Sequence, residues 1–307
     1  MKVKFLGDFI PFFVKINKDI MILPKWLVDF YIRCTRENEK SCRKELTVDK
    51  HTENYTLPKR FKFPRPITKT EQLGIEVFEM PAESEDKPIL LYLHGGAYIH
   101  PFSPFHWYFL VEMAKKTGCG LVVPNYLMMP KWTAKLSNEV TMNWYEEFTK
   151  THDMSKVIIA GDSAGGGLSC VVIQRAIKIG LPIPNKAILI SPWVDVTGGN
   201  PEKDKVDNMI DYKMVSLYGE AWQKGMKDKD PFASPLYGDM KGFPKTDLWI
   251  GGNEVLYNDV ISLYDKLKEK NVDVNLHYEE NEGHVFPLYP TKCGKKSREK
   301  IAKFILE

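Results

Sequence analysis

The chain has 307 residues, of which 43% are hydrophobic and 27% are charged, and its 43 basic residues against 40 acidic ones give a formal net charge of +3. These proportions are ordinary for a globular protein and allow a full hydrophobic core. The charge is too balanced to indicate nucleic acid as a partner. At this length the chain forms one large domain or two small ones.

The five cysteines are scattered along the chain and include no C-x-x-C pair. They are Cys34, Cys42, Cys119, Cys170 and Cys293. An odd and dispersed set of this kind indicates reduced thiols in a reducing compartment, so we expect a cytoplasmic protein. The set indicates no metal site, and nothing else in the sequence calls for an organic cofactor.

An apolar run at residues 5–14 follows Lys2 and Lys4 near the start of the chain. Asp8 and Pro11 interrupt the run and no small-residue cleavage site follows it, so we expect an amphipathic segment and not a cleaved signal peptide. The run is also too short to span a bilayer. Contact of this segment with a membrane surface is left open.

Strand and helix patterns alternate along the chain from residue 74 onward. Strands are expected at residues 74–80, 89–93, 120–124, 157–160, 186–191, 246–252 and 272–278. Helices are expected at residues 107–116, 136–149, 168–179, 260–270 and 297–306. This alternation predicts an α/β fold with a mostly parallel, doubly wound sheet covered by helices on both faces.

Two segments interrupt this alternation. The first is the N-terminal segment 1–60, and the second is a polar insertion at about 198–240 with a helical middle at 210–223. Ligands bind at the carboxyl edge of open α/β sheets, and both segments could meet there. We therefore expect a cap segment at 1–60, a main domain at 61–307, and a second cap element within that domain.

A sharp turn, Gly161-Asp-Ser163-Ala-Gly165, joins an apolar strand pattern to a helical one. A serine at the apex of such a turn is held in a cramped backbone conformation, and glycines two residues away on either side avoid clashes. The N-terminus of the following helix favours a developing negative charge. The pattern is typical of a nucleophilic serine, although a glycine-rich turn with a helix-capping serine would look the same.

A serine hydroxyl needs a base at neutral pH, and the base needs an orienting carboxylate. In folds with this turn the chain order is serine, acid, histidine. Only His277 and His284 follow Ser163. His277 falls inside a strand pattern and is expected to be structural. His284 lies in the loop between the last strand and the last helix, so we expect it to be the base.

Three acidic residues near the strand at 246–252 could orient that base. Glu254 lies just past the strand end and is the expected acid. Asp259 lies about a turn further on, near a helix start, and is the alternative. Asp247 precedes the strand and so would lie at the wrong end of the sheet.

The reaction of a nucleophilic serine also needs hydrogen-bond donors for an oxyanion. His94-Gly95-Gly96-Ala97 leaves the strand at 89–93, and its glycines let backbone N–H groups approach a ligand. We expect the donors to be the N–H groups of Gly95, Gly96 and Ala164. We expect His94 to hold the loop by hydrogen bonds.

With these residues the chain resembles the hormone-sensitive-lipase-like branch of the α/β-hydrolase fold. The matching blocks are His94-Gly-Gly-Ala-Tyr98, Pro124-Asn-Tyr126 with Pro130, Gly161-Asp-Ser-Ala-Gly-Gly166, Ser191-Pro-Trp-Val-Asp195, Asp230-Pro-Phe-Ala-Ser-Pro235 and His284-Val-Phe-Pro287. The resemblance covers about residue 74 to the end. It implies hydrolysis of short-acyl carboxylic esters of small molecules, and a helical cap built from the two interrupting segments.

The chain departs from the family pattern in two places. Glu254 stands where the family usually has aspartate, and its extra methylene requires a backbone adjustment. The usual Tyr-Arg-Leu-Ala-Pro-Glu block reads Tyr126-Leu-Met-Met-Pro-Lys131 here, without the arginine and the glutamate. We expect this departure to change the local structure of the block and not the serine, acid and histidine.

Several alternative functions are compatible with these residues. One is an amidase or deacetylase with the same serine, acid and histidine. Another is a non-catalytic ligand-binding protein of the same fold, as in the gibberellin receptors, which lack the histidine; the presence of both Ser163 and His284 argues against it. A third is a lipase that works at a membrane surface. The sequence does not indicate the acyl or alcohol group, and it leaves a monomer and a homodimer open.

Overall fold

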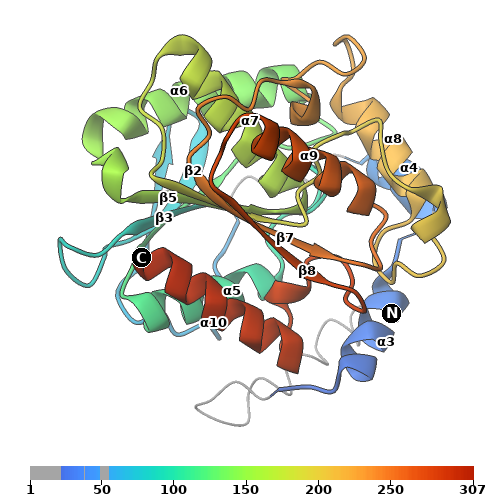
Figure 1. Ribbon diagram of the computed structural model, residues 1–307, viewed down its shortest axis with the longest axis horizontal. Helices are drawn as coiled ribbons and strands as arrows, with labels where there is room; N and C mark the ends of the chain where they lie inside the picture. Colours follow the sequence, from blue (N-terminus) through green and yellow to red (C-terminus); the bar gives the residue numbers. More distant parts are fainter. Residues whose placement is uncertain (1–21, 38, 49–54) are drawn as a thin grey trace.

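The computed structural model describes residues 22–37, 39–48 and 55–307 (Figure 1). The apolar run at residues 5–14 lies outside these residues. The described chain forms one eight-stranded sheet in the order β1-β2-β4-β3-β5-β6-β7-β8. The strands are β1 (Thr68–Gln72), β2 (Ile75–Met80), β3 (Ile89–Leu93), β4 (Gly120–Asn125), β5 (Val157–Asp162), β6 (Lys186–Ile190), β7 (Lys245–Gly251) and β8 (Val274–Glu279).

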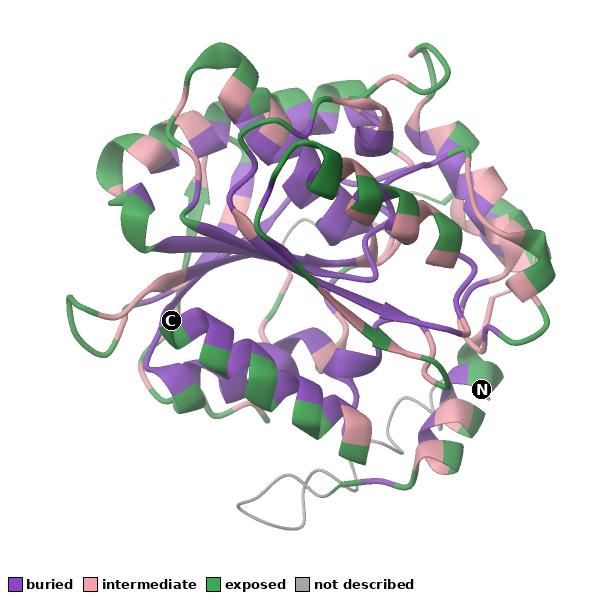
Figure 2. Cartoon of the chain, in the orientation of Figure 1, coloured by how far each residue is buried: buried purple, intermediate pink, exposed green. Residues whose placement is uncertain are grey.

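The sheet is mostly parallel, as the alternation of strands and helices predicts. β1 pairs with β2 and β2 with β4 in antiparallel fashion, and every further pair is parallel. Strands β3 to β6 are buried almost throughout, because helices cover both faces of a parallel sheet. Figure 2 shows this burial along the centre of the molecule.

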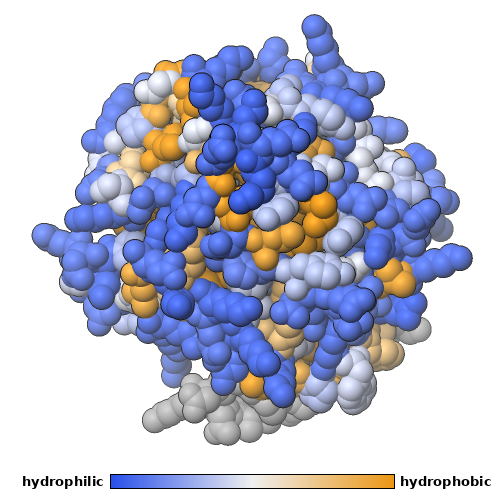
Figure 3. Space-filling model, in the orientation of Figure 1, coloured by the Kyte–Doolittle hydropathy of each residue, from blue (hydrophilic) through white to orange (hydrophobic). Residues whose placement is uncertain are grey.

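Helices lie on both faces of the sheet. They are α3 (Lys25–Thr35), α4 (Glu39–Glu45), α5 (Pro104–Thr117), α6 (Ala134–Thr151), α7 (Ser163–Ile179), α8 (Tyr212–Trp222), α9 (Tyr257–Glu269) and α10 (Lys292–Leu306), with short 3-10 turns η1 (Met154–Lys156), η2 (Pro201–Lys203), η3 (Pro235–Tyr237) and η4 (Phe286–Leu288). α5 and α10 cover one face, and α6, α7 and α9 cover the other (Figure 1). Hydrophilic side chains cover most of the outer surface seen in Figure 3.

The sequence analysis missed strand β1. All but the last of its residues, Thr-Lys-Thr-Glu-Gln, are exposed, so no apolar alternation marks it. It is joined to β2 by Leu73 and Gly74, which both have positive φ, 51° and 79°. A two-residue turn of this kind matches the twist of a hairpin and sets the pairing of Gln72 with Ile75.

The two interrupting segments contact each other in the structure. Helix α4 packs against α8, which lies in the insertion after β6 (Figure 1). Arg36 Nη2 lies 2.8 Å from Asp204 Oδ1 and donates a hydrogen bond to the Ile210 carbonyl at 2.9 Å. Arg36 therefore connects the first segment to residues of the insertion that lie 168 and 174 positions later in the chain.

None of the helices in the described residues is long and apolar enough to cross a membrane. All five cysteines lie in the described part of the chain and all are free thiols. Burial raises the pKa of the Cys170 thiol to about 12 and that of Cys119 to about 11. These two side chains are therefore core residues and not reagents, as expected for Cys170.

Candidate active site

Ser163 lies at the junction of β5 and α7. Its φ is +50°, a left-handed conformation that is costly for a residue with a side chain. A Cβ atom on Gly165 would overlap the carbonyl groups of Leu93 and His94 at the end of β3, so only glycine allows the turn to pack there. The structure therefore places Ser163 on the strained turn that the sequence predicts.

Ser163 and His284 line the same cavity, which has a volume of about 360 Å³. The cavity lies at the carboxyl edge of the sheet, because Ser163 follows β5 and Gly96 follows β3. Part of its wall comes from the two segments that interrupt the fold: Tyr31 belongs to α3, and Met209 precedes α8.

Further lining comes from the start of α5, with Phe105 and His106, and from η4, with Leu288. The lining is mainly apolar, and its polar groups include Arg36, Glu37 and His100 as well as Asp162 beside the serine.

His284 is bonded to a buried carboxylate. Its Nδ1 lies 2.8 Å from Glu254 Oε2, and the exposed fractions of the two residues are 4% and 0%. A carboxylate only accepts hydrogen bonds, so Nδ1 carries the proton and Nε2 is left with its lone pair. The imidazole is thus held in the tautomer that can accept a proton from a hydroxyl.

Two opposing effects act on the pKa of His284. Burial lowers the pKa, because it disfavours the imidazolium, whereas the hydrogen bond and the charge of Glu254 raise it. The charge of Asp207 adds to the second effect, and the pKa ends above its ordinary value of 6.5. A base whose pKa is raised in this way holds an abstracted proton more readily.

Glu254 is itself held by two donors. Its Oε1 accepts hydrogen bonds from the Ser191 hydroxyl at 2.8 Å and from the Gly251 N–H at 2.6 Å. The Ser191 hydroxyl in turn accepts from the Val285 N–H at 3.1 Å, next to the histidine. One serine therefore connects Glu254 to the loop that carries His284.

The other two acidic candidates lie apart from His284. Asp247 lies within β7 and not ahead of it, and its carboxylate bonds to Asn275 and His277 of β8. Asp259 packs beside Asp195 at Gly198, where burial and the charge of Asp195 raise its pKa to about 7. The carboxylate beside the histidine is that of Glu254.

The loop at Gly95 and Gly96 corrects one expectation. The Gly95 N–H donates to Asp162 Oδ1 at 2.9 Å, so it is directed into the protein and not toward a ligand. Gly96 and Ala97 line the cavity, and neither of their N–H groups donates to another backbone group in the described part of the chain. Both have positive φ, 122° and 52°, which turns the loop at this point.

Asp162 makes a set of buried contacts beside Ser163 that the sequence analysis did not predict. Besides the Gly95 N–H it accepts from the Tyr92 hydroxyl at 2.5 Å, and its Oδ2 lies 3.2 Å from His106 Nε2. Burial alone would raise its pKa, but these three partners outweigh burial and lower it. The sequence shows that Asp162 precedes Ser163. It does not show the partners of Asp162, because they lie 56 to 70 positions away along the chain.

His94 is structural, as expected. It is fully buried, and its Nδ1 lies 2.6 Å from the Gly95 carbonyl oxygen. The ring stacks on Tyr126 with centroids 4.6 Å apart, and the Tyr126 hydroxyl donates to the His94 carbonyl at 2.7 Å. Burial lowers its pKa to about 3, so the ring is neutral and part of the loop's support.

One group in the described residues has donor atoms suited to a metal ion. Glu37, Glu45 and His100 present ligand atoms within 4.8 Å of one another. The two ring nitrogens of His100 face different carboxylates, Nε2 toward Glu37 at 3.2 Å and Nδ1 toward Glu45 at 3.4 Å. The arrangement is accounted for by the His100 imidazole lying between two carboxylates. Glu37 and His100 also line the cavity that contains Ser163.

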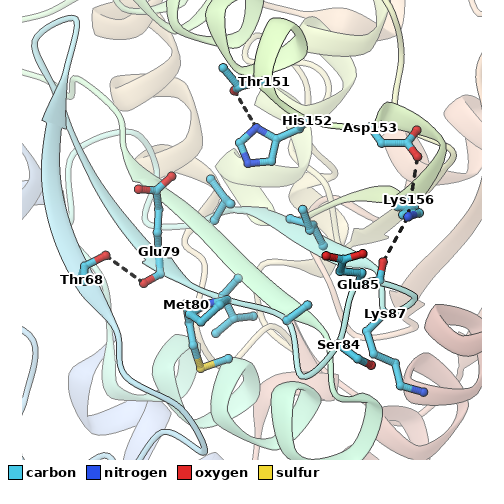
Figure 4. Close-up of a pocket in the computed structure, with 15 residues that line it drawn as sticks. Thr68, Glu79, Met80, Ser84, Glu85, Lys87, Thr151, His152, Asp153 and Lys156 are labelled. Atoms are coloured by element: carbon cyan, nitrogen blue, oxygen red, sulfur yellow. Dashed lines mark hydrogen bonds and ion pairs between the residues drawn. The ribbon is translucent and has the colours of Figure 1, made fainter.

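A second cavity, of about 540 Å³, lies at the opposite edge of the sheet (Figure 4). Its polar side chains are engaged with neighbouring groups: Lys156 donates to the Glu85 carbonyl at 3.1 Å, and His152 Nδ1 lies 2.9 Å from the Thr151 hydroxyl. None of the expected site residues lines it. The candidate site is therefore the smaller cavity that contains Ser163.

Comparisons with known proteins identify the fold family. A family model described as the alpha/beta hydrolase fold matches residues 90–288. The chain is 26% identical over 238 residues to an acetyl-hydrolase of Streptomyces hygroscopicus, covering 72% of this chain and 79% of that protein. It is 29% identical over 191 residues to a triacylglycerol lipase of Mycobacterium tuberculosis, covering 62% of this chain but only 40% of the lipase.

Solved structures show the same fold over most of the chain. A hormone-sensitive lipase from a metagenome library superposes with a TM-score of 0.78, covering 92% of this chain and 98% of that one at 25% identity. A homologue of hormone-sensitive lipase, also from a metagenome library, gives a TM-score of 0.79 at 23% identity, covering 93% of this chain and 98% of that one. The chain belongs to the alpha/beta hydrolase fold family, in its hormone-sensitive-lipase-like branch, and is a carboxylic ester hydrolase.

Proposed function

We propose that this protein is a serine esterase that cleaves short-acyl esters through an acyl-enzyme, with Ser163 as nucleophile, His284 as base and Glu254 as orienting acid. The observation that carries the proposal is the 2.8 Å hydrogen bond between His284 Nδ1 and Glu254 Oε2 in the wall of a cavity that also holds Ser163. Each of the three follows the carboxyl end of a different strand, where side chains of this fold converge.

The first half of the reaction transfers the acyl group. Ser163 Oγ bonds to the carbonyl carbon while its proton passes to His284 Nε2. The bond from that carbon to the alcohol oxygen then breaks, and the alcohol leaves with the proton from His284. In the second half, water gives a proton to His284, attacks the acyl carbon and releases the acid as the proton returns to Ser163.

The oxyanion of both tetrahedral intermediates needs preorganised donors. We propose the N–H groups of Gly96, Ala97 and Ala164. Ala164 is in the first turn of α7, where N–H groups have no acceptor within the helix. Asp162 holds the Gly95 N–H and so orients the N–H groups of the next two residues toward the cavity.

The cavity supports a small substrate. Its volume of about 360 Å³ is near the lower end for small-molecule sites, and its lining is mainly apolar. We propose that residues 1–60 and about 198–240 form one cap over it, since Tyr31 and Ile32 of the first segment and Ile210 and Met214 of the second line it together.

The proposal is tested by hydrolysis of p-nitrophenyl esters of increasing acyl length. Wild type should cleave acetyl and butyryl esters fastest, and Ser163→Ala should lower kcat/KM by at least a thousandfold. Ser169→Ala is a matched control, because Ser169 lies in the same helix with its hydroxyl bonded to the Gly165 carbonyl. A folded wild type that cleaves aryl acetamides but no ester would instead be an amidase.

A further inference from the structure

Arg298 of α10 is a buried charge between two helices on one face of the sheet (Figure 1). Its exposed fraction is 1%, and its Nε donates to Glu112 Oε2 of α5 at 2.8 Å. Its Nη2 donates to the Tyr108 hydroxyl at 3.1 Å, and the other carboxylate oxygen of Glu112 lies 3.8 Å from Lys116 Nζ. A buried charge is costly unless it is paired and hydrogen-bonded. The ion pair with α5 accounts for only part of the guanidinium.

The third nitrogen of Arg298 holds two backbone carbonyls outside the helices. Nη1 donates to the Pro287 carbonyl at 2.7 Å and to the Tyr289 carbonyl at 2.6 Å. Pro287 lies within η4, and Tyr289 directly follows it. Hydrogen bonds from a charged donor are stronger than those between neutral groups, so the guanidinium fixes η4 to α10.

Gly294 provides a second contact between α10 and η4. A Cβ atom at this position would overlap the Tyr289 carbonyl and lie 2.9 Å from the Phe286 carbonyl oxygen. Glycine therefore lets both carbonyls approach the helix backbone about one turn before Arg298. The 3-10 turn is held on α10 by close packing as well as by charge.

Two consecutive turns connect η4 to His284. The Phe286 N–H donates to the Gly283 carbonyl at 3.3 Å, and the turn that this bond closes contains His284 and Val285. The Leu288 N–H then donates to the Val285 carbonyl at 2.9 Å. A displacement of η4 would therefore be passed through these turns to the backbone of His284.

The loop needs support from outside, because Val285 has a φ of +52°, which is unusual for a β-branched residue. The Ser191 hydroxyl accepts from the Val285 N–H at 3.1 Å, and Arg298 holds the chain two and four residues further on. We propose that Arg298 is a positioning residue that, through η4, keeps His284 aligned with Glu254. Arg298 itself does not line the cavity, and its effect on catalysis rests on the proposed esterase function.

A pair of variants separates positioning from stability. Arg298→Met leaves the Glu112 charge buried without its arginine and should lower Tm strongly, whereas Arg298→Met/Glu112→Met removes both charges and should regain much of that Tm. At a temperature where both are folded, both should have a kcat on p-nitrophenyl butyrate about tenfold to a hundredfold below wild type, since a misplacement of about 1 Å can cost a hundredfold. A double variant whose kcat returns together with its Tm would overturn the proposal.

Gly294→Ala tests the same contact with Arg298 and Glu112 in place. The added methyl group pushes the Tyr289 carbonyl away from α10, so kcat should again fall by about tenfold. This variant decides the question if the double variant does not fold. Wild-type kcat in Gly294→Ala would then overturn the proposal.

Lys186→Met is the matched control. Lys186 is another buried cation, 8% exposed, and it donates to a carbonyl of the same helix, that of Phe304, at 2.9 Å. It lies at the start of β6, away from η4. Lys186→Met should lower Tm and leave kcat within about twofold of wild type. A loss of kcat equal to that of the Arg298 variants would reduce the role of Arg298 to general stability and overturn the proposal.

A spectroscopic measurement keeps the positioning separate from the esterase function. In protein with isotope-labelled histidine, the His284 Nδ1–H bonded to Glu254 should give a downfield proton signal that is absent in His284→Gln. The signal should remain in Lys186→Met and be broadened or lost in Arg298→Met/Glu112→Met, and an unchanged signal in the double variant would overturn the positioning. A folded wild type that cleaves no ester, with the signal lost in the double variant, would overturn the esterase function and leave the positioning in place.

Discussion

The Ser191 hydroxyl donates a hydrogen bond to Glu254 Oε1 at 2.8 Å and accepts one from the Val285 N–H at 3.1 Å. Ser191 is fully buried and has a φ of +45°, so its position at the end of β6 is set by the backbone. Ser191, just after β6, therefore holds Glu254, the proposed acid. β6 is the neighbour of β5, the strand that leads to the proposed nucleophile Ser163.

Ser191→Ala should lower kcat by about tenfold to a hundredfold, because a hydrogen bond to a charged group is worth about 1.5–3 kcal/mol. KM should change little, since Ser191 does not line the cavity. Steady-state kinetics on a soluble ester check this. Ser297→Ala removes another buried serine hydroxyl, bonded to the Cys293 carbonyl in α10, and should leave kcat unchanged.

Glu254→Gln should change both the rate and its pH dependence. The glutamate raises the pKa of His284, and the proposed base must be neutral, so activity rises with pH through that pKa. Removing the charge lowers the pKa, and the acid limb of kcat/KM should move to lower pH while the maximum falls by orders of magnitude. A limb that stays in place would mean that Glu254 does not act on the histidine.

Asp259→Asn should leave kcat within about twofold of wild type, because Asp259 packs beside Asp195 and not beside His284. Loss of activity in this variant, with Glu254→Gln active, would reverse the assignment of the acid.

The same substitution should change the pH dependence of stability. Burial and Asp195 raise the pKa of Asp259 from 3.8 to about 7, so the folded state binds more protons than the unfolded state between these values. The free energy of unfolding of wild type therefore falls as pH rises from about 4 to about 7. Asp259→Asn should remove this fall, with a Tm about 2–4 °C above wild type at pH 8 and no such gain at pH 4.

Asp162→Ala should lower kcat by about tenfold to a hundredfold, because it removes the carboxylate that accepts from the Gly95 N–H and holds the proposed oxyanion loop. Asp247→Ala is the control: Asp247 is an equally buried aspartate with a histidine partner, His277, in β8. It should lower Tm without lowering kcat. Equal kcat losses in the two variants would indicate general destabilisation and no special role for Asp162.

Much of the fold was predictable because it depends on local patterns. The buried strands β3 to β6 appear as continuous apolar runs, and the helices between them as amphipathic patterns. The expected strand bounds differ from the structure by only a few residues. Strand β1 was missed because its polar residues carry no such pattern, and its place comes from pairing with β2.

The sequence by itself determined the turn at Ser163, since a serine between flanking glycines, after an apolar strand and before a helix, dictates that geometry locally. It also placed Glu254 and His284 at strand ends. Only the tertiary structure decided that Glu254 and not Asp259 meets His284, that Gly95 donates to Asp162, and that Ser191 holds the acid. The physical reason is that these hydrogen bonds join residues 30 to 67 positions apart, and such partners are chosen by packing around the sheet and not by the neighbouring residues in the chain.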